Sequence, residues 1–152
     1  MGLKALNNKQ TEKIKNSLTS WFGINKFPLE EVIFFQRGDK KIFVVSPDLK
    51  RLDPFPPRPN SLGMYFAIEE NAWFRLSLEG SQILGPSSKK NVIEINKKEL
   101  QEWFNGMDLR IDSKEKGFVI LKYREDYVGC GYVKEGKILN YIPKNRRVTD
   151  LF

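Results

Sequence analysis

The chain has 152 residues, of which 40% are hydrophobic and 30% charged, and its formal net charge is +7. This composition is that of a folded globular protein with one sound core or two small ones, and it excludes a disordered chain. The sequence has no histidine and one cysteine, which excludes histidine-based catalytic triads, His-rich zinc sites and an internal disulfide. Carboxylate, lysine and tyrosine chemistry stays open, but the missing histidine weighs against an enzyme, and we expect no catalytic residue, no metal site and no cofactor.

The apolar residues predict neither a membrane span nor a secretion signal. Apolar runs such as residues 32–35 are far shorter than the roughly 20 residues that a spanning helix needs. The N-terminus lacks the apolar core of a signal peptide. Together with the single cysteine, these features favour a cytoplasmic protein without a membrane partner.

The first 58 residues predict a small α/β domain. A helix begins near Thr11, has apolar residues at helical spacing and stops at Gly23. Two β-type runs at 31–36 and 41–46 are joined through a Gly-Asp turn, which predicts a hairpin. A short helix at 47–51 is expected to follow.

A proline-rich segment predicts the domain boundary. Residues 53–59 contain four of the eight prolines and can form neither a helix nor a central strand. This divides the chain into an N-terminal α/β domain, residues 1–58, and a second domain, residues 59–152.

The second domain shows mostly β-type patterns. We expect strands at 62–68, 72–77, 91–95, 117–123, 127–134 and 137–142, a helical turn at 79–84, and a helix at 97–104 capped by Asn96 and ended by Gly106. Many short strands with one or two short helices predict a small closed or nearly closed β-barrel. The predicted fold class is therefore α+β.

The positive charge is concentrated at two places. Residues 1–58 carry a net charge of +5, residues 59–133 carry −1, and residues 134–147 carry +4. A localised basic cluster suits a nucleic-acid backbone, because each neutralised phosphate releases condensed counterions. A solvated lysine-rich surface is the open alternative.

The last third of the chain carries a family resemblance. It lies in the apolar strand 118–123, the Gly129-Cys130-Gly131 strand, the Glu-Gly turn and strand at 135–140, and the basic run 142–147, with a looser match at 103–109. The sequence resembles the PUA superfamily of RNA-binding domains, and within it the PUA-like domain of Sun-family RNA cytosine-5 methyltransferases. A small α/β unit ahead of such a domain is also similar to archaeal stand-alone relatives.

The resemblance implies a PUA-like mixed β pseudo-barrel that binds structured RNA, tRNA or rRNA, in RNA modification or ribosome biogenesis. The chain shows no glycine-rich methyl-donor loop, and its one cysteine lies in a predicted strand. We therefore expect a non-enzymatic RNA-binding protein, whose further partners include an RNA methyltransferase or a ribosome assembly factor. The alternative is a protein-interaction adaptor that positions a separate RNA-modifying enzyme.

The candidate RNA-binding residues fall into three chemical groups. Basic side chains suit phosphates, amides suit base edges or the 2′-hydroxyl, and tyrosines suit stacking on unpaired bases. The basic residues are Lys134, Lys137, Lys144, Arg146 and Arg147, the amides are Asn140 and Asn145, and the tyrosines are Tyr132 and Tyr141.

Several of these residues have a structural alternative. The tyrosines can be packed, and Asn140 can be an internal hydrogen-bonding residue at the final turn. Gly129 and Gly131 can admit a close ligand or only relieve crowding at a barrel bend. We expect Cys130 to be a buried strand residue, and the three tryptophans to be core. The N-terminal lysines can extend an RNA footprint or flank a protein-docking face.

Overall fold

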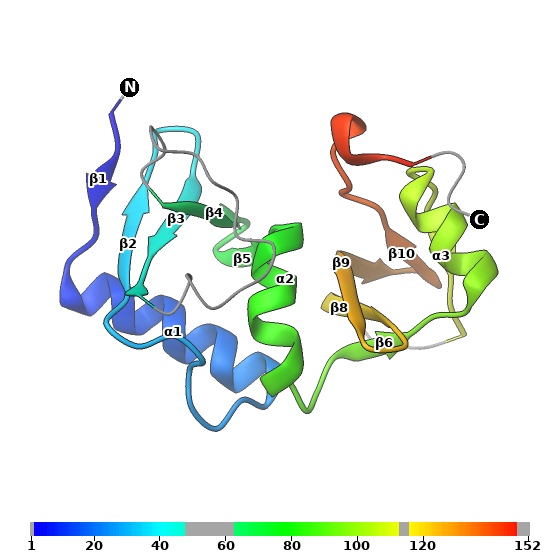
Figure 1. The fold of residues 1–152 in the computed structure, drawn as a ribbon, viewed down its shortest axis with the longest axis horizontal. Coiled ribbons are helices and arrows are strands. Elements are labelled where there is room, and N and C mark those ends of the chain that lie inside the picture. Colours follow the sequence, from blue (N-terminus) through cyan, green and yellow to red (C-terminus); the bar gives the residue numbers. More distant parts are fainter. Residues whose placement is uncertain (1, 48–62, 113–115, 149–152) are drawn as a thin grey trace.

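The computed structural model describes residues 2–47, 63–112 and 116–148 (Figure 1). Within these residues the strands form two five-stranded sheets, in the orders β1-β2-β3-β4-β5 and β6-β8-β9-β10-β7. The second sheet curls into a half-barrel, and helices pack on both sheets. The predicted α+β class is confirmed. No helix in the described part of the chain is long and apolar enough to cross a membrane.

The first sheet is an antiparallel meander covered by a helix. Its strands are β1 (Lys4–Ala5), β2 (Ile33–Gln36), β3 (Lys41–Val45), β4 (Met64–Glu70) and β5 (Trp73–Leu76), and α1 (Asn8–Phe22) runs beneath it in Figure 1. The hairpin predicted at 31–36 and 41–46 is confirmed as β2 and β3. The short helix predicted at 47–51 falls almost wholly outside the described residues.

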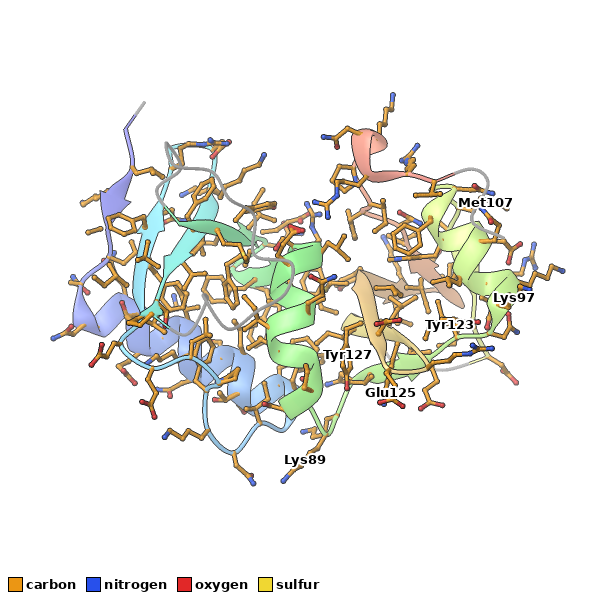
Figure 2. All side chains as sticks on the ribbon, viewed as in Figure 1. Lys89, Lys97, Met107, Tyr123, Glu125 and Tyr127 are labelled. Atoms are coloured by element: carbon orange, nitrogen blue, oxygen red, sulfur yellow. The ribbon has the colours of Figure 1, made fainter. Side chains whose placement is uncertain are left out.

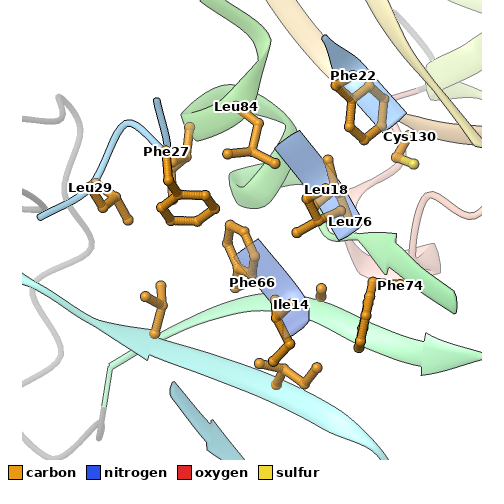
Figure 3. Packing of buried hydrophobic residues seen from close by; sticks show 14 of the residues in the cluster. Ile14, Leu18, Phe22, Phe27, Leu29, Phe66, Phe74, Leu76, Leu84 and Cys130 are labelled. Carbon is orange, nitrogen blue, oxygen red and sulfur yellow. The ribbon is translucent and has the colours of Figure 1, made fainter. Parts of the chain in front are cut away.

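Both ends of α1 are capped by the sequence. Asn7 Oδ1 accepts the Gln10 amide at 2.9 Å, and Gln10 Oε1 accepts the Asn7 amide at 3.0 Å. This capping box starts the helix three residues before Thr11, where the hydrophobic pattern alone placed it. Gly23 ends the helix in the left-handed conformation, with φ 64°. The helix buries one apolar stripe in the core of Figure 3: Ile14, Leu18 and Phe22.

Strands β4 and β5 lie in the first sheet and not with the C-terminal strands. β4 pairs with β3 across the proline-rich segment, and its Met64 and Phe66 share a core with Ile42 and Val44 of β3. Alternating apolar residues show that a strand is half buried, but not which neighbour it pairs with. Sheet membership therefore changes between β5 and β6, and the domain division at residue 58 stays a prediction.

The second sheet follows two short helical segments. These are α2 (Leu78–Leu84) and the 3₁₀ turn η2 (Gly85–Ser87), after which come β6 (Val92–Glu94), α3 (Lys97–Phe104), β7 (Leu109–Arg110), β8 (Gly117–Tyr123), β9 (Asp126–Lys134), β10 (Lys137–Leu139) and the 3₁₀ turn η3 (Lys144–Arg146). β6 runs parallel to β8, and the other pairs are antiparallel. The predicted helix after Asn96 and the predicted strands at 117–134 are confirmed to within one residue.

Strand β8 is buried on both faces. Phe118 and Ile120 belong to the core that α1 and the first sheet build, whereas Val119 and Leu121 belong to the core beneath α3. Helix α2 lies between the two sheets (Figure 1), and Tyr127 of β9 packs against its end at Gly85 (Figure 2). The run 118–121 is continuously apolar because each face of the strand meets a different core.

Trp103 explains the two glycines of β9. Its ring is fully buried, and its Nε1 donates to the Val128 carbonyl at 2.8 Å. A Cβ at Gly129 would lie 3.0 Å from that nitrogen, and a Cβ at Gly131 would lie 2.9 Å from the Leu139 carbonyl oxygen and also meet the Ile138 side chain. The glycines therefore relieve crowding between the indole and the sheet, which is one of the two roles considered above.

We predict that Gly131→Ala lowers the free energy of unfolding by about 1–3 kcal/mol, because the added methyl overpacks the sheet against backbone that cannot move away. The measurement is a urea titration, in which the midpoint should fall at constant slope. Gly2→Ala is the control, since a Cβ there meets nothing within 4 Å. Equal midpoints for the two variants would contradict the crowding assignment.

Candidate nucleic-acid interface

The β9–β10 turn presents two lysines. Lys134 and Lys137 are cross-strand partners on either side of the turn, and both are exposed. The turn residues Glu135 and Gly136 have φ values of 51° and 77°, a pair of left-handed residues that matches the twist of a two-residue hairpin. Both lysines are therefore exposed at the two ends of a tight two-residue turn.

Asn140 is bound inside the protein. Its Nδ2 donates to the carbonyl oxygens of Trp103 and Met107 at 2.7 and 2.9 Å, and its Oδ1 accepts the Ile142 amide at 2.8 Å. Its backbone amide donates to Asp108 Oδ1 at 2.8 Å. Both ends of the amide are used to fix the chain after β10 to the turn after α3. This geometry corresponds to the internal role that the sequence left open.

The basic run after Asn140 contains two kinds of cation. Arg146 forms an ion pair with Glu79 of α2, with Nη2 and Oε2 2.9 Å apart. Arg147 donates from Nε to the Ile142 carbonyl at 3.3 Å and packs against Gly106. Lys144 and Asn145 are exposed in η3. Within the described residues, Lys134, Lys137 and Lys144 have no carboxylate partner, so three of the five predicted phosphate contacts are unpaired.

A cavity of about 540 Å³ lies between the two sheets and joins residues distant in sequence. Its lining comes from the end of α1, the β4–β5 turn, the start of β8, and the β9–β10 hairpin. The lining residues are Trp21, Glu70, Asn71, Trp73, Lys116, Gly117, Phe118, Tyr132, Val133, Lys134, Glu135, Leu139 and Tyr141. Three of the predicted site residues meet here, and the turn cations Lys137 and Lys144 do not line the cavity.

Two of the three tryptophans line this cavity, although their residue type and spacing predicted core positions. Trp21 and Trp73 are half-buried, and their rings meet edge to face at 5.8 Å. Trp21 Nε1 also donates to the Phe118 carbonyl at 2.8 Å, across 97 positions of the sequence. Only Trp103 is wholly core. Periodicity in the sequence marks Trp21 as part of a helical apolar stripe, and it gives no sign that a strand of the other sheet lies beside it.

The tyrosines of the cavity are both packed and accessible. The guanidinium of Arg75 lies 4.0 Å from the centre of the Tyr141 ring, and its Nε is 2.8 Å from Glu70 Oε2. Burial raises the pKa of Tyr141, so its hydroxyl remains protonated at neutral pH and can donate a hydrogen bond. Tyr132 meets Phe118 edge to face at 4.9 Å. Each ring is held by one neighbour and still lines the cavity.

Among the described residues, no group of three or more histidine, cysteine, aspartate or glutamate side chains is placed to hold a metal ion. Cys130 is buried in the core of the first sheet, as predicted. Burial raises the pKa of its thiol to about 12. Its sulfur is therefore a small apolar group at neutral pH and not a nucleophile.

The C-terminal part of the chain is similar to a known family of domains. Residues 90–148 match the family model described as Methyltransferase RsmF PUA domain. The PUA resemblance predicted from the sequence is confirmed for this part of the chain. The match runs from β6 through η3 and includes the whole basic segment 134–147.

The chain is also similar to proteins named Ribosomal RNA small subunit methyltransferase F. It is 25% identical over 138 residues to the protein of Vibrio vulnificus (strain YJ016) and 28% identical over 145 residues to that of Vibrio campbellii (strain ATCC BAA-1116). Each alignment covers 90% of this chain but only 28% and 29% of the relative. The chain thus spans less than a third of the length of these relatives. Because these alignments cover 90% of the chain, the similarity extends to residues before position 90. Trp21 and Trp73 lie in this first part of the chain, outside the residues that match the PUA domain.

We predict that Asn140→Ala lowers the free energy of unfolding by about 1–3 kcal/mol, because three backbone groups lose their partner. Asn140→Asp should also destabilise the protein, since a carboxylate cannot donate to two carbonyls. Thermal or urea unfolding measures both effects. Asn145→Ala is the matched control from an exposed position and should change stability by less than about 0.5 kcal/mol.

We further predict that Cys130 does not react with a thiol reagent such as iodoacetamide while the protein is folded, and reacts fully in denaturing urea. The reason is its burial and its raised pKa. Labelling followed by mass spectrometry makes the measurement. Fast, complete labelling of the folded protein would show that this part of the shared core opens readily.

Proposed function

We propose that this chain binds structured RNA, and specifically ribosomal RNA, as the RNA-binding unit of a modification or ribosome-assembly step. One observation carries the proposal. Residues 90–148, which match a PUA domain, present exposed cations on their last hairpin and on the segment that follows, and three of these cations have no carboxylate partner among the described residues. Ribosomal RNA is preferred to tRNA because the relatives are named for the small-subunit ribosomal RNA.

The binding would be chiefly electrostatic. Lys134, Lys137 and Lys144 lie within one short stretch of chain, the first two beside a tight turn and the third in a 3₁₀ turn, and none forms an ion pair within the part of the chain that the structure describes. A lysine without a carboxylate partner can neutralise a phosphate without first breaking an ion pair. Each such contact releases counterions and makes the affinity depend on salt.

We infer that this chain supplies binding and does not itself catalyse methyl transfer. The supporting facts are that the family match covers a PUA domain, that the only cysteine is buried with a pKa of about 12, and that the sequence has no glycine-rich methyl-donor loop. An RNA methyltransferase or ribosome assembly factor acting on the same RNA is the expected partner, and the cytoplasm the expected location.

We predict that affinity for small-subunit ribosomal RNA falls steeply between about 50 and 200 mM salt. Lys137→Ala and Lys144→Ala should each lower the slope of log affinity against log salt by about 0.7–0.9, because each removes one phosphate contact. Filter binding or fluorescence anisotropy over a salt series makes the measurement.

The control is Lys98→Ala, which removes an exposed lysine of α3 outside the basic segment. Its slope should match that of the unmodified protein. Binding without salt dependence, or slopes that the two test variants leave unchanged, would contradict the proposal. An adaptor that contacts only protein would give that result while still retaining its protein partner.

A further inference from the structure

We propose that the cavity between the two sheets holds one unpaired nucleobase of the bound RNA. This inference rests on the proposed RNA-binding function. It adds where a base of the RNA binds, which interactions hold it, and that the base must be unpaired. The basic segment alone accounts for phosphate contacts, which carry no information about the bases.

The cavity has the size and walls that a base requires. Its volume of about 540 Å³ lies within the range of roughly 300–1,000 Å³ that small-molecule sites occupy. Five aromatic residues contribute to its lining: Trp21 and Trp73 from the first half of the chain, and Phe118, Tyr132 and Tyr141 from the second. Every base has a π-face, so a set of aromatic side chains around one space favours stacking whatever the base.

The aromatic walls are held in place before any ligand arrives. Trp21 is fixed by its hydrogen bond to the Phe118 carbonyl. Tyr141 is fixed by Arg75, which covers one ring face and is itself fixed by Glu70. A base that stacks on the Tyr141 ring would continue this guanidinium–aromatic stack. Because little side-chain freedom remains to be lost, binding would cost little ordering entropy.

The polar lining fits a nucleotide better than an apolar ligand. Lys134 and Lys116 are exposed cations that line the cavity, and they would neutralise the phosphates on either side of the base. The Glu70 carboxylate is already paired with Arg75. Asn71 and the hydroxyl of Tyr141 can hydrogen-bond a base edge. Glu135 is the remaining carboxylate, and it lies on the exposed turn between Lys134 and Lys137.

The arrangement selects unpaired nucleotides. In an A-form duplex the faces of the bases are covered by their neighbours and their Watson–Crick edges are paired, so no base can enter a cavity. A bulged or loop nucleotide is already unstacked, or leaves its stack at a cost of a few kcal/mol. The expected RNA is therefore a helix with a bulge or loop, whose backbone reaches the basic segment while one base enters the cavity.

The test uses two RNA hairpins that differ only in one bulged 2-aminopurine nucleotide, and it compares two tyrosines. Tyr141 and Tyr123 are both half-buried, lie in the same domain and have an arginine over the ring, Arg75 at 4.0 Å and Arg124 at 5.2 Å. Only Tyr141 lines the cavity, whereas Tyr123 ends β8 at the opposite end from Gly117 (Figure 2).

We expect the protein to bind the bulged hairpin more tightly and to quench its 2-aminopurine emission. Tyr141→Ala should weaken this binding about 5- to 150-fold and remove the quench, which is the effect of losing a stacking contact worth about 1–3 kcal/mol. Binding to the paired hairpin should not change, and Tyr123→Ala should bind both RNAs like the unmodified protein. Circular dichroism confirms that each variant is folded.

A second pair of variants keeps the test decisive if a tyrosine variant unfolds. Lys134 and Lys137 are exposed partners across one turn, and only Lys134 lines the cavity. Lys134→Ala should reduce the preference for the bulged hairpin, whereas Lys137→Ala should weaken both RNAs alike. Equal affinity for the two hairpins, or no quench, would overturn the base-binding inference and leave the proposed function standing. Absence of salt-dependent binding to either RNA would overturn both.

Discussion

The arrangement of this molecule depends on a single strand that is apolar on both faces. Strand β8 places Phe118 and Ile120 in the core of α1 and the first sheet, and Val119 and Leu121 in the core beneath α3. Two half-buried sheets with a polar strand at the contact would form separate domains. Here the strand belongs to one sheet by hydrogen bonding and to both cores by packing, so neither half buries its apolar surface without the other.

The position of the cavity follows from the packing of both cores on β8. Where the first residues of β8 leave the shared core, the end of α1 and the β4–β5 turn face the β9–β10 hairpin without filling the space between them. Gly117 makes the approach possible: it has φ 108°, and a Cβ there would lie 2.7 Å from the Trp21 ring. The absence of that side chain lets Trp21 reach over the strand to the Phe118 carbonyl. A packing requirement therefore places an aromatic side chain of the first half beside the tyrosines of the second.

Local features were predictable from the sequence, whereas the packing of the two sheets against each other was not. A dense apolar run marks the strands at 117–134, Asn96 marks the start of the helix that it caps, and Glu-Gly marks the closing turn. Lys134, Tyr132 and Tyr141 could be nominated because basic and aromatic residues gather in the last predicted strands and the segment that follows them. Trp21 and Trp73 could not, since their place in the cavity depends on how the two sheets pack. Nor does the sequence show that β4 joins β3, because alternation specifies a buried face and no partner.

The charge of a segment also differs from the charge that it offers to a ligand. Residues 134–147 carry +4, but Arg146 is held by Glu79 and Arg147 lies against Gly106 with its Nε on a backbone carbonyl. To contact a phosphate, Arg146 must leave or share the Glu79 carboxylate. Much of the electrostatic energy gained with the phosphate would then only replace that of the existing ion pair, whereas a lysine without an ion pair gives up only counterions and water. Arg146 thus ties the segment to α2 and Arg147 packs on the turn after α3, whereas Lys134, Lys137 and Lys144 form no ion pair among the described residues. A basic run can therefore stabilise a fold with some of its cations and still leave others available to a polyanion, because different side chains would perform the two tasks.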